Sequence, residues 1–321
     1  MRVFAGALAA ALLSIAASTA VSAETWPSRP VKVVVPFPPG AATDATARVL
    51  ANELSQLLGQ PFVIVNKGGA DGAIGSTEVV RAAPDGYTLL VGSNSGIVVA
   101  PLLRKNPPYD TLKDFTPVSF LGESTFFITV HPSVPAKSLA EFIAYAKANP
   151  MKLNYATGNT MGIVSSSLLA RSNGIEMQHV PYKNDTEAIP DLLSGQVQLI
   201  IATALNVVPH AKVGNLRLLA TTVAERSPLM PDVPTIVEAG QRPFPVAPWA
   251  AIVGPANLPA DIVEKLNRAT VAAFAKPDVR EGMAKQGFAV RTNTAAELAA
   301  FLKDQVQVWS KSLREAGLEP Q

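Results

Sequence analysis

The sequence predicts an α/β protein of two lobes, with mainly parallel sheets covered by helices and a ligand cleft between the lobes. Short runs of apolar, β-branched residues alternate with segments of helical periodicity along most of the chain. No low-complexity linker separates the two halves, so the chain has to cross between them on ordered strands. The 321 residues, of which 48% are hydrophobic, suffice for two cores without any disulfide, since the chain has no cysteine.

Residues 1–23 have the pattern of a secretory signal peptide. Arg2 supplies a positive start, residues 3–17 form an apolar run, and Val21-Ser22-Ala23 offers the small residues at which a signal peptidase cuts. The apolar run is short for a membrane span, and an uncleaved anchor is the alternative. We expect cleavage after Ala23, export to the periplasm and a soluble mature chain from residue 24 to residue 321.

The first mature segment predicts alternating strands and helices. Strands are expected at residues 31–35, 62–65 and 88–91, with helices at 44–58 and 72–82 between them. Gly59 and Pro61 end the first helix, and Pro84-Asp85-Gly86 is a turn. This β-α-β-α-β order is typical of a parallel sheet covered on both faces.

A second unit of the same style begins near residue 126. Strands are expected at 126–130, 154–156, 177–180 and 198–201, and helices at 138–149, 164–171 and 185–193. Ser138 should cap its helix, with Glu141 as the capping-box partner. A strand at 250–253 and helices at 259–275 and 294–316 complete the chain.

The expected crossings near Phe126 and Trp249 divide the chain into lobes. Residues 24–125 plus 250–321 would form lobe 1, and residues 126–249 would form lobe 2. Two crossings make a hinge, and a cleft between hinged lobes is a common place for a small ligand.

The loop at residues 36–44 is the strongest candidate for a binding site. It leaves the carboxyl end of the first strand and enters a helix whose N-terminal N–H groups suit an anion. An ordinary connection, with Asp44 as a cap paired to Arg48, is the alternative. The residues that we expect at the ligand are Phe37, Pro39, Gly40, Ala41, Ala42 and Asp44.

Three further loops follow strand ends. Ser93, Asn94 and Ser95 lie in a Gly-x-x-x-Gly segment whose centre is asparagine rather than the serine of a nucleophile elbow, so they are expected as hydrogen-bond donors. Residues 68–75 lack the first glycine of a dinucleotide fingerprint and favour a tight turn. The fourth loop mirrors the first, and a plain glycine turn is its alternative; its candidate residues are Thr157, Gly158, Asn159 and Thr160.

The composition argues against several classes of function. Lys and Arg total 27 against 25 acidic residues, without runs of like charge, so no nucleic-acid partner is expected. The three histidines have no metal-ligand spacing, and no nucleophile is paired with a base. We therefore expect no metal, no cofactor and no enzymatic activity.

The ordered set of these motifs resembles the Bug/TctC family of extracytoplasmic solute receptors, which serve tripartite tricarboxylate transporters. The resemblance covers the mature chain and rests on Pro36-Phe37-Pro38-Pro39-Gly40 with Asp44, Pro84-Asp85-Gly86-Tyr87-Thr88-Leu89-Leu90, His131-Pro132-Ser133, Leu153-Asn154-Tyr155-Ala156, His179-Val180-Pro181-Tyr182-Lys183 and Pro231-Asp232-Val233-Pro234-Thr235. It implies a type II periplasmic-binding fold and a carboxylate held by the loops at Phe37–Asp44 and Thr157–Thr160.

The chain departs from the family pattern at three places. Gly40-Ala41 stands where members often have two glycines, and Ile163 where they often have a histidine. Members often carry an aspartate where this chain has Ala202. Ala202 and Thr203 are the last two residues of the expected site. Without that acid, a ligand ammonium would be poorly compensated, so a dicarboxylate or an aromatic acid is favoured over an amino acid.

The expected function is that of a monomeric receptor that hands a small carboxylate to membrane subunits of a tripartite tricarboxylate-type transporter. A sensor that presents the ligand to a signalling partner is one alternative. A periplasmic hydrolase is another, but the sequence offers it no catalytic set.

Overall fold

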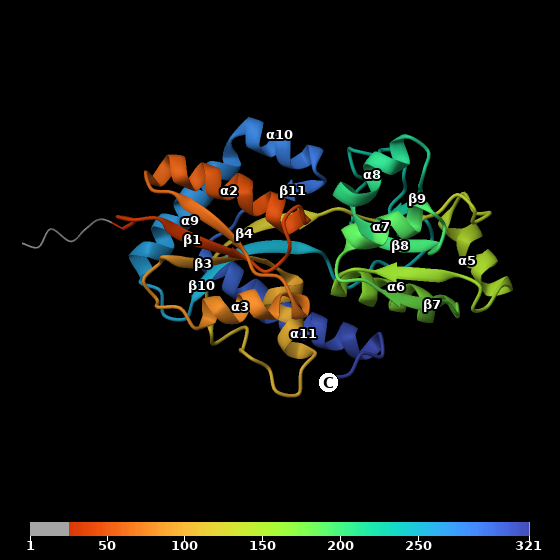
Figure 1. The fold of residues 1–321 in the computed structure, drawn as a ribbon, viewed down its shortest axis with the longest axis horizontal. Helices are drawn as coiled ribbons and strands as arrows, with labels where there is room; N and C mark the ends of the chain where they lie inside the picture. The colour runs from red at the N-terminus through yellow and green to blue at the C-terminus, as the bar shows by residue number, and fades with distance from the viewer. Residues whose placement is uncertain (1–25, 321) are drawn as a thin grey trace, which may run out of the picture.

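The computed structural model describes residues 26–320, which form two sheets lying side by side, each with helices on both faces (Figure 1). The predicted signal peptide lies outside the described residues. None of the helices in the described part combines the length and the apolar character that crossing a membrane requires.

The first sheet has the strand order β11-β4-β10-β3-β1-β2. Strand β1 pairs parallel with β2 and β3, whereas β10 runs antiparallel to β3 and β4, and β11 antiparallel to β4. The bounds are β1 (Val31–Val35), β2 (Phe62–Asn66), β3 (Thr88–Ser93), β4 (Phe115–Ser124), β10 (Trp249–Pro255) and β11 (Phe288–Val290).

Successive residues of these strands point to opposite faces, and this alternation builds two cores. Val33 packs with α2 (Ala42–Leu58), α9 (Ala260–Ala275) and α10 (Pro277–Lys285), whereas Val34 packs toward the other face. That other face carries the short turn η1 (Ala70–Gly72), α3 (Ala73–Val80), the π-helical turn η2 (Ser95–Val99), α4 (Ala100–Leu102) and α11 (Ala295–Glu315).

The second sheet has the order β7-β6-β8-β5-β9. Helices α5 (Leu139–Ala148) and α6 (Thr160–Asn173) cover one face, and α7 (Asp185–Leu193) and α8 (Ala204–Lys212) cover the other. Strand β6 is parallel to β7 and β8, and β5 is antiparallel to β8 and β9. The bounds are β5 (Phe126–Val130), β6 (Asn154–Thr157), β7 (Gln178–Pro181), β8 (Leu199–Thr203) and β9 (Arg217–Thr221).

Both sheets are therefore mixed, not mainly parallel as expected. A helical crossover within one sheet makes its two strands parallel. Strands β5 and β10 are instead entered from the other sheet, without such a helix, and both run antiparallel to their neighbours. The sequence analysis also missed β4, β9, β11 and α10. Within β4, Pro117 and the positive φ of Gly122 interrupt the alternation that marks a strand.

The helix ends agree better with the sequence-based predictions than the strand directions do. The Ser138 hydroxyl accepts a hydrogen bond from the Glu141 N–H, which confirms the predicted cap. The Glu141 carboxylate bonds to the N–H of Lys137 rather than to that of Ser138, so the capping box is incomplete. Thr294 and Glu297 make a complete capping box at the start of α11.

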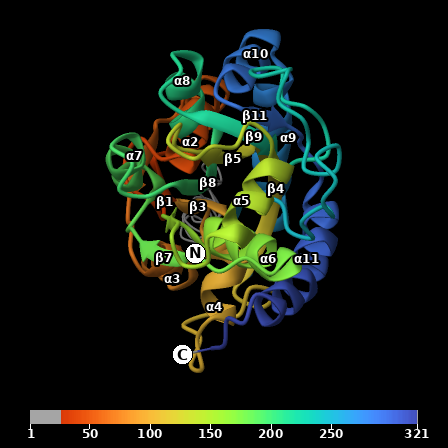
Figure 2. The same cartoon turned by 90° about the vertical axis from the view of Figure 1, so that its right-hand side faces the viewer.

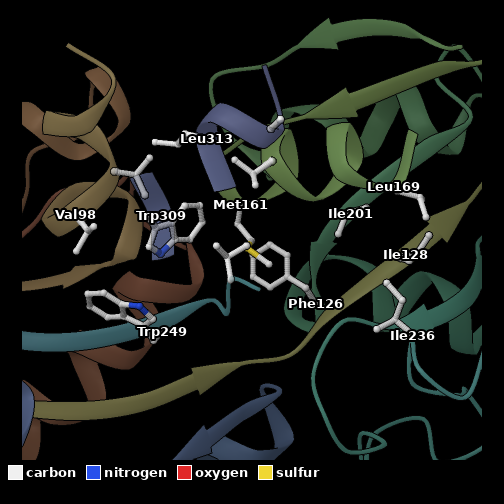
Figure 3. Packing of buried hydrophobic residues seen from close by; sticks show 14 of the residues in the cluster. Val98, Phe126, Ile128, Met161, Leu169, Ile201, Ile236, Trp249, Trp309 and Leu313 are labelled. Carbon is white, nitrogen blue, oxygen red and sulfur yellow. The ribbon is translucent and has the colours of Figure 1, made fainter. Parts of the chain in front are cut away.

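One hydrophobic core runs from the first sheet into the second. Trp309 and Leu313 of α11 belong to the same buried cluster as Phe126, Met161 and Ile201 of the second unit (Figure 3). Viewed from the side, α6 passes next to α11 (Figure 2). The chain passes from β4 to β5 through Thr125 and returns at Trp249. The two sheets thus share a packed side as well as two connections.

Candidate functional site

A cavity of about 90 Å³ lies between the two sheets, where strands of both end. Phe37 and Ala42 line it after β1, and Gly158 lines it after β6. A wider cavity of about 550 Å³ adjoins the first, because six residues line both. Strand ends of an α/β sheet are where ligands collect, so the two cavities together form the candidate site. The shared residues are Phe37, Pro38, Ser95, Gly158, Asn159 and Asn184.

The N-terminus of α2 faces the smaller cavity. Ala41 precedes the helix in an extended conformation and supplies no side-chain cap. The N–H groups of the first helical turn therefore lack the usual capping partner and carry the positive end of the helix dipole. Ala41, Ala42 and Thr43 line the cavity, so this end of the helix is placed to receive an anion.

Asp44 holds this loop in place through hydrogen bonds. It is buried and accepts hydrogen bonds from Gly40 N–H at 2.9 Å, Arg48 Nε at 2.9 Å and Asn66 Nδ2 at 2.8 Å. Burial alone would raise the pKa of the Asp44 carboxyl, but the bonds from Arg48, Asn66 and Gly40 together lower it. Asp44 lines neither cavity; it pairs with Arg48, as the alternative expected, and it bonds to the Gly40 N–H rather than capping the first turn of α2.

The other predicted residues of this loop divide by position. Phe37, Ala41 and Ala42 line the cavity, whereas Pro39 and Gly40 do not. Gly40 has φ +82°, a left-handed conformation that turns the chain toward α2.

The predicted donors after β3 also reach the smaller cavity. Ser93, Asn94 and Ser95 line it, and Asn94 is only 2% exposed. Within residues 26–320, Asn94 Nδ2 has no hydrogen-bond partner. A buried amide N–H₂ without a partner costs free energy, which a ligand oxygen would recover.

In the second sheet, Gly158 and Asn159 line the smaller cavity, whereas Thr157 lines only the wider one. Asn159 Oδ1 caps α6 by accepting from Gly162 N–H at 2.8 Å. A Cβ at Gly158 would overlap the backbone of Asn184 and Asp185, so only glycine allows these loops to lie so close.

The remaining predicted residues differ in whether they reach the cavity. Thr160 is fully buried in α6 and lines neither cavity. Ala202 is also fully buried, with its side chain in the core against α7 and α8. Thr203 does line the smaller cavity, and in the described part of the chain its hydroxyl has no partner.

The sequence analysis missed Asp185, the first residue of α7. Asp185 lines the smaller cavity, and both carboxylate oxygens accept from Asn159 Nδ2 at 2.8 Å. Burial raises the pKa of this carboxyl to about 7, against hydrogen bonds from Asn159 and from the backbone N–H groups of Gly158 and Thr203. The strand-end rule that selected the other loops would have found it, since the short loop after β7 leads into Asp185.

Apolar side chains form the rest of the wall. Phe126, Met161, Trp249 and Phe288 line the smaller cavity, and Figure 3 shows three of them in the core between the sheets. The Trp249 indole N–H donates to Gln305 Oε1 at 2.9 Å, which fixes the ring. Trp249 thus both lines the cleft and packs where the chain crosses between the sheets.

The chemistry of the cleft is that of a binding site. Of the residues that the structure describes, no histidine lines either cavity. Across residues 26–320, acidic and histidine side chains form no group able to hold a metal ion. Neutral donors, a helix N-terminus and an apolar wall suit a small organic anion.

Two α/β lobes with such a cleft define a solute-binding protein of the type II periplasmic-binding fold. The family described as "Tripartite tricarboxylate transporter family receptor" (TctC) matches residues 46–318. The chain belongs to this family, which confirms the resemblance and the fold class predicted from the sequence.

Several characterised relatives are similar over almost their whole length. Protein BugT of Bordetella pertussis is 38% identical over 301 residues, which are 92% of each chain. The structure of Rpa4515 of R. palustris with adipate superposes with a TM-score of 0.87 at 32% identity, covering 92% of this chain and 100% of that one. MatC of Rhodopseudomonas palustris, with bound malate, has a TM-score of 0.82 at 34% identity, covering 90% and 100%.

Proposed function

We propose that this protein is a periplasmic receptor that captures a small organic carboxylate in the cleft and delivers it to a tripartite tricarboxylate-type membrane transporter. One observation carries the proposal: the uncapped N-terminus of α2 and the unpartnered, buried Asn94 Nδ2 line the same cavity. Both are donors that an anion satisfies. Two relatives, bound to adipate and to malate, support a carboxylate.

The ligand carboxylate would lie against lobe 1. We propose contacts with Phe37, Ala41 and Ala42 of the first loop and with Ser93, Asn94 and Ser95 after β3, because all six line the smaller cavity. Gly158, Asn159 and Thr203 would close the site from lobe 2. Pro39, Gly40, Asp44, Thr157 and Thr160 would shape these loops without touching the ligand there.

The sequence-based preference for a dicarboxylate or an aromatic acid rested on Ala202. Its side chain packs in the core against α7 and α8, away from the cavity, so it cannot decide whether a ligand amine is compensated. The nature of the ligand's other end therefore has to be argued from residues that do line the cavity.

We also propose that the chain acts as a monomer, is cleaved after Ala23 and catalyses no reaction. Lobe 1 would comprise residues 24–125 plus 250–321, and lobe 2 residues 126–249, since β4 passes into β5 at residue 125 and β10 begins at Trp249. The family match supports a role as a receptor rather than as an enzyme.

A thermal-shift screen of the mature protein against a library of small carboxylates tests the proposed function. We expect at least one acid to raise the melting temperature in a concentration-dependent way. Asn94→Asp should weaken that acid at least tenfold, about 1.4 kcal/mol, because it adds a negative charge and removes a donor. Asn215→Asp, at an exposed asparagine before β9, is the control. If no carboxylate stabilises the protein, the proposal fails.

A further inference from the structure

We propose that Asp185 determines which group the receptor accepts at the end of the ligand opposite its carboxylate. The Asp185 carboxylate would pair with an ammonium group there and repel a second carboxylate, so the receptor prefers an acid that carries an ammonium group. This inference rests on the proposed function and specifies its substrate class. The preferred ligands would be amino acids, with the carboxylate on lobe 1 and the nitrogen toward lobe 2.

The position of Asp185 is the first step. The smaller cavity is lined by residues of both sheets, and Asp185 is the one charged residue among them. It lies on lobe 2, whereas the uncapped α2 and Asn94 lie on lobe 1. A ligand that spans the cavity from the lobe 1 donors therefore brings its other end toward an acidic group.

The donors of lobe 2 are the second step. The Asn159 amide donates to both Asp185 oxygens at 2.8 Å, and the backbone N–H groups of Gly158 and Thr203 also bond to them. These are the groups that could otherwise hold a second ligand carboxylate. Asp185 already uses them, which leaves the Thr203 hydroxyl as the unpartnered lobe 2 donor among the described residues that line this cavity, so a second ligand carboxylate would meet like charge with little compensation.

The missing counter-charge is the third step. Among residues 26–320, no Lys, Arg or His side chain lines the smaller cavity together with Asp185. Asn159, Gly158 and Thr203 are neutral, and Lys183 and Glu187, on its own loop and helix, line the wider cavity instead. A buried carboxylate without a cation is costly, and a ligand ammonium would pair with it.

Matched ligand pairs test the inference by calorimetry at pH 8. The pairs are succinate with β-alanine, glutarate with 4-aminobutanoate, and adipate with 5-aminopentanoate, in which an ammonium replaces one carboxylate. Aspartate, glutamate and the best acid of the library, with its own amino analogue, complete the set. We expect the ligand that binds most tightly to carry an ammonium group. Its affinity should be at least tenfold higher than that of the dicarboxylate with which it is paired.

Asp185→Asn should remove or reverse this preference. Asp191→Asn removes the same charge from the same helix but lies outside both cavities, where Asp191 accepts from the Tyr182 hydroxyl, and it should leave the preference unchanged. An unchanged ratio in Asp185→Asn, or an equal change in Asp191→Asn, would overturn the assignment.

The wild-type protein offers a second readout that needs no substitution. Asp185 must be ionised to pair with an ammonium, so the amino ligand should bind about tenfold more tightly at pH 8 than at pH 6. The side chains of His131, His179 and His210 line neither of the two cavities. Tighter binding of dicarboxylates than of amino acids at pH 8 refutes the inference alone, whereas no binding of any carboxylate refutes the proposed function with it.

Discussion

At the scale of single residues, two buried carboxylates act in opposite directions. Hydrogen bonds lower the pKa of Asp44, so its contribution to stability is present above its ordinary pKa and is lost as the pH falls. Burial raises the pKa of Asp185 to about 7, so this group opposes folding once the pH exceeds its ordinary value of 3.8. Asp44 therefore stabilises the fold. A buried carboxylate that destabilises the fold, as Asp185 does, is what we expect of a residue that binds a ligand.

Asp185→Asn should therefore change how stability depends on pH. A pKa of about 7 in place of 3.8 corresponds to a cost of about 4 kcal/mol at pH 8, of which 2–3 kcal/mol, roughly, accrues between pH 5 and pH 8. We expect the free energy of unfolding of the ligand-free variant, relative to wild type, to rise by that amount over this range. Urea titrations at both pH values measure it, and a constant difference would show that Asp185 is not buried as a charge.

At the scale of elements, the site depends on how closely the β6–α6 loop approaches the start of α7. Gly158 makes this approach possible, because a Cβ there would overlap the backbone of Asn184 and Asp185. The same contact places Asn159 against Asp185. The lack of a side chain at this one position thus determines the geometry of the lobe 2 half of the cleft.

Gly158→Ala should push these two loops apart. We expect a loss of roughly 2–4 kcal/mol in the free energy of unfolding, as for other overpacked sites, and a loss of ligand affinity of at least tenfold. Gly282→Ala is the matched control, since nothing lies within 4 Å of its added Cβ and the position is within α10. That variant should gain roughly 0.5–1 kcal/mol, because alanine favours a helix. Denaturant titration and calorimetry compare the two, and a harmless Gly158→Ala would contradict the steric reason given for this glycine.

At the scale of the whole molecule, the cleft favours movement between the lobes, whereas the shared core restricts it. The cleft lies between lobes joined at Thr125 and near Trp249, which suits a hinge. On the packed side, α11 carries Trp309 and Leu313 into a core that includes Met161 of α6. Any closing motion has to pivot about this core rather than separate the lobes freely.

Ligand binding should therefore close the cleft by a limited rotation. We expect a smaller radius of gyration with a saturating ligand, measured by small-angle X-ray scattering, because lobe 2 moves toward the α2 N-terminus. The Asn94→Asp variant is the control and should need at least tenfold more ligand to reach the same decrease in the radius of gyration. Identical profiles of the wild type with and without ligand would argue for a preformed cleft.

Much of this architecture could be predicted from local patterns. Strand β1 and helix α7 have the predicted bounds, and Ser138 caps its helix as expected. The lining residues Phe37, Asn94 and Asn159 were found because strand-end loops are recognisable in sequence. Such features depend on neighbours within a few residues, which the sequence lists in order.

The tertiary structure alone decided the direction of the strands and the charge within the cleft. Strands β5 and β10 run antiparallel because each is entered from the other sheet, a relation between segments that are far apart in the sequence. Asp185 reaches the cavity, and Ala202 turns away from it, because side-chain direction in a strand or first helical turn is set by packing against other elements. The sequence by itself determined the two-lobe α/β class, the family and the strand-end loops, since these follow from local periodicity and ordered motifs. Which of those residues face the ligand is a property of long-range packing, which no local pattern encodes.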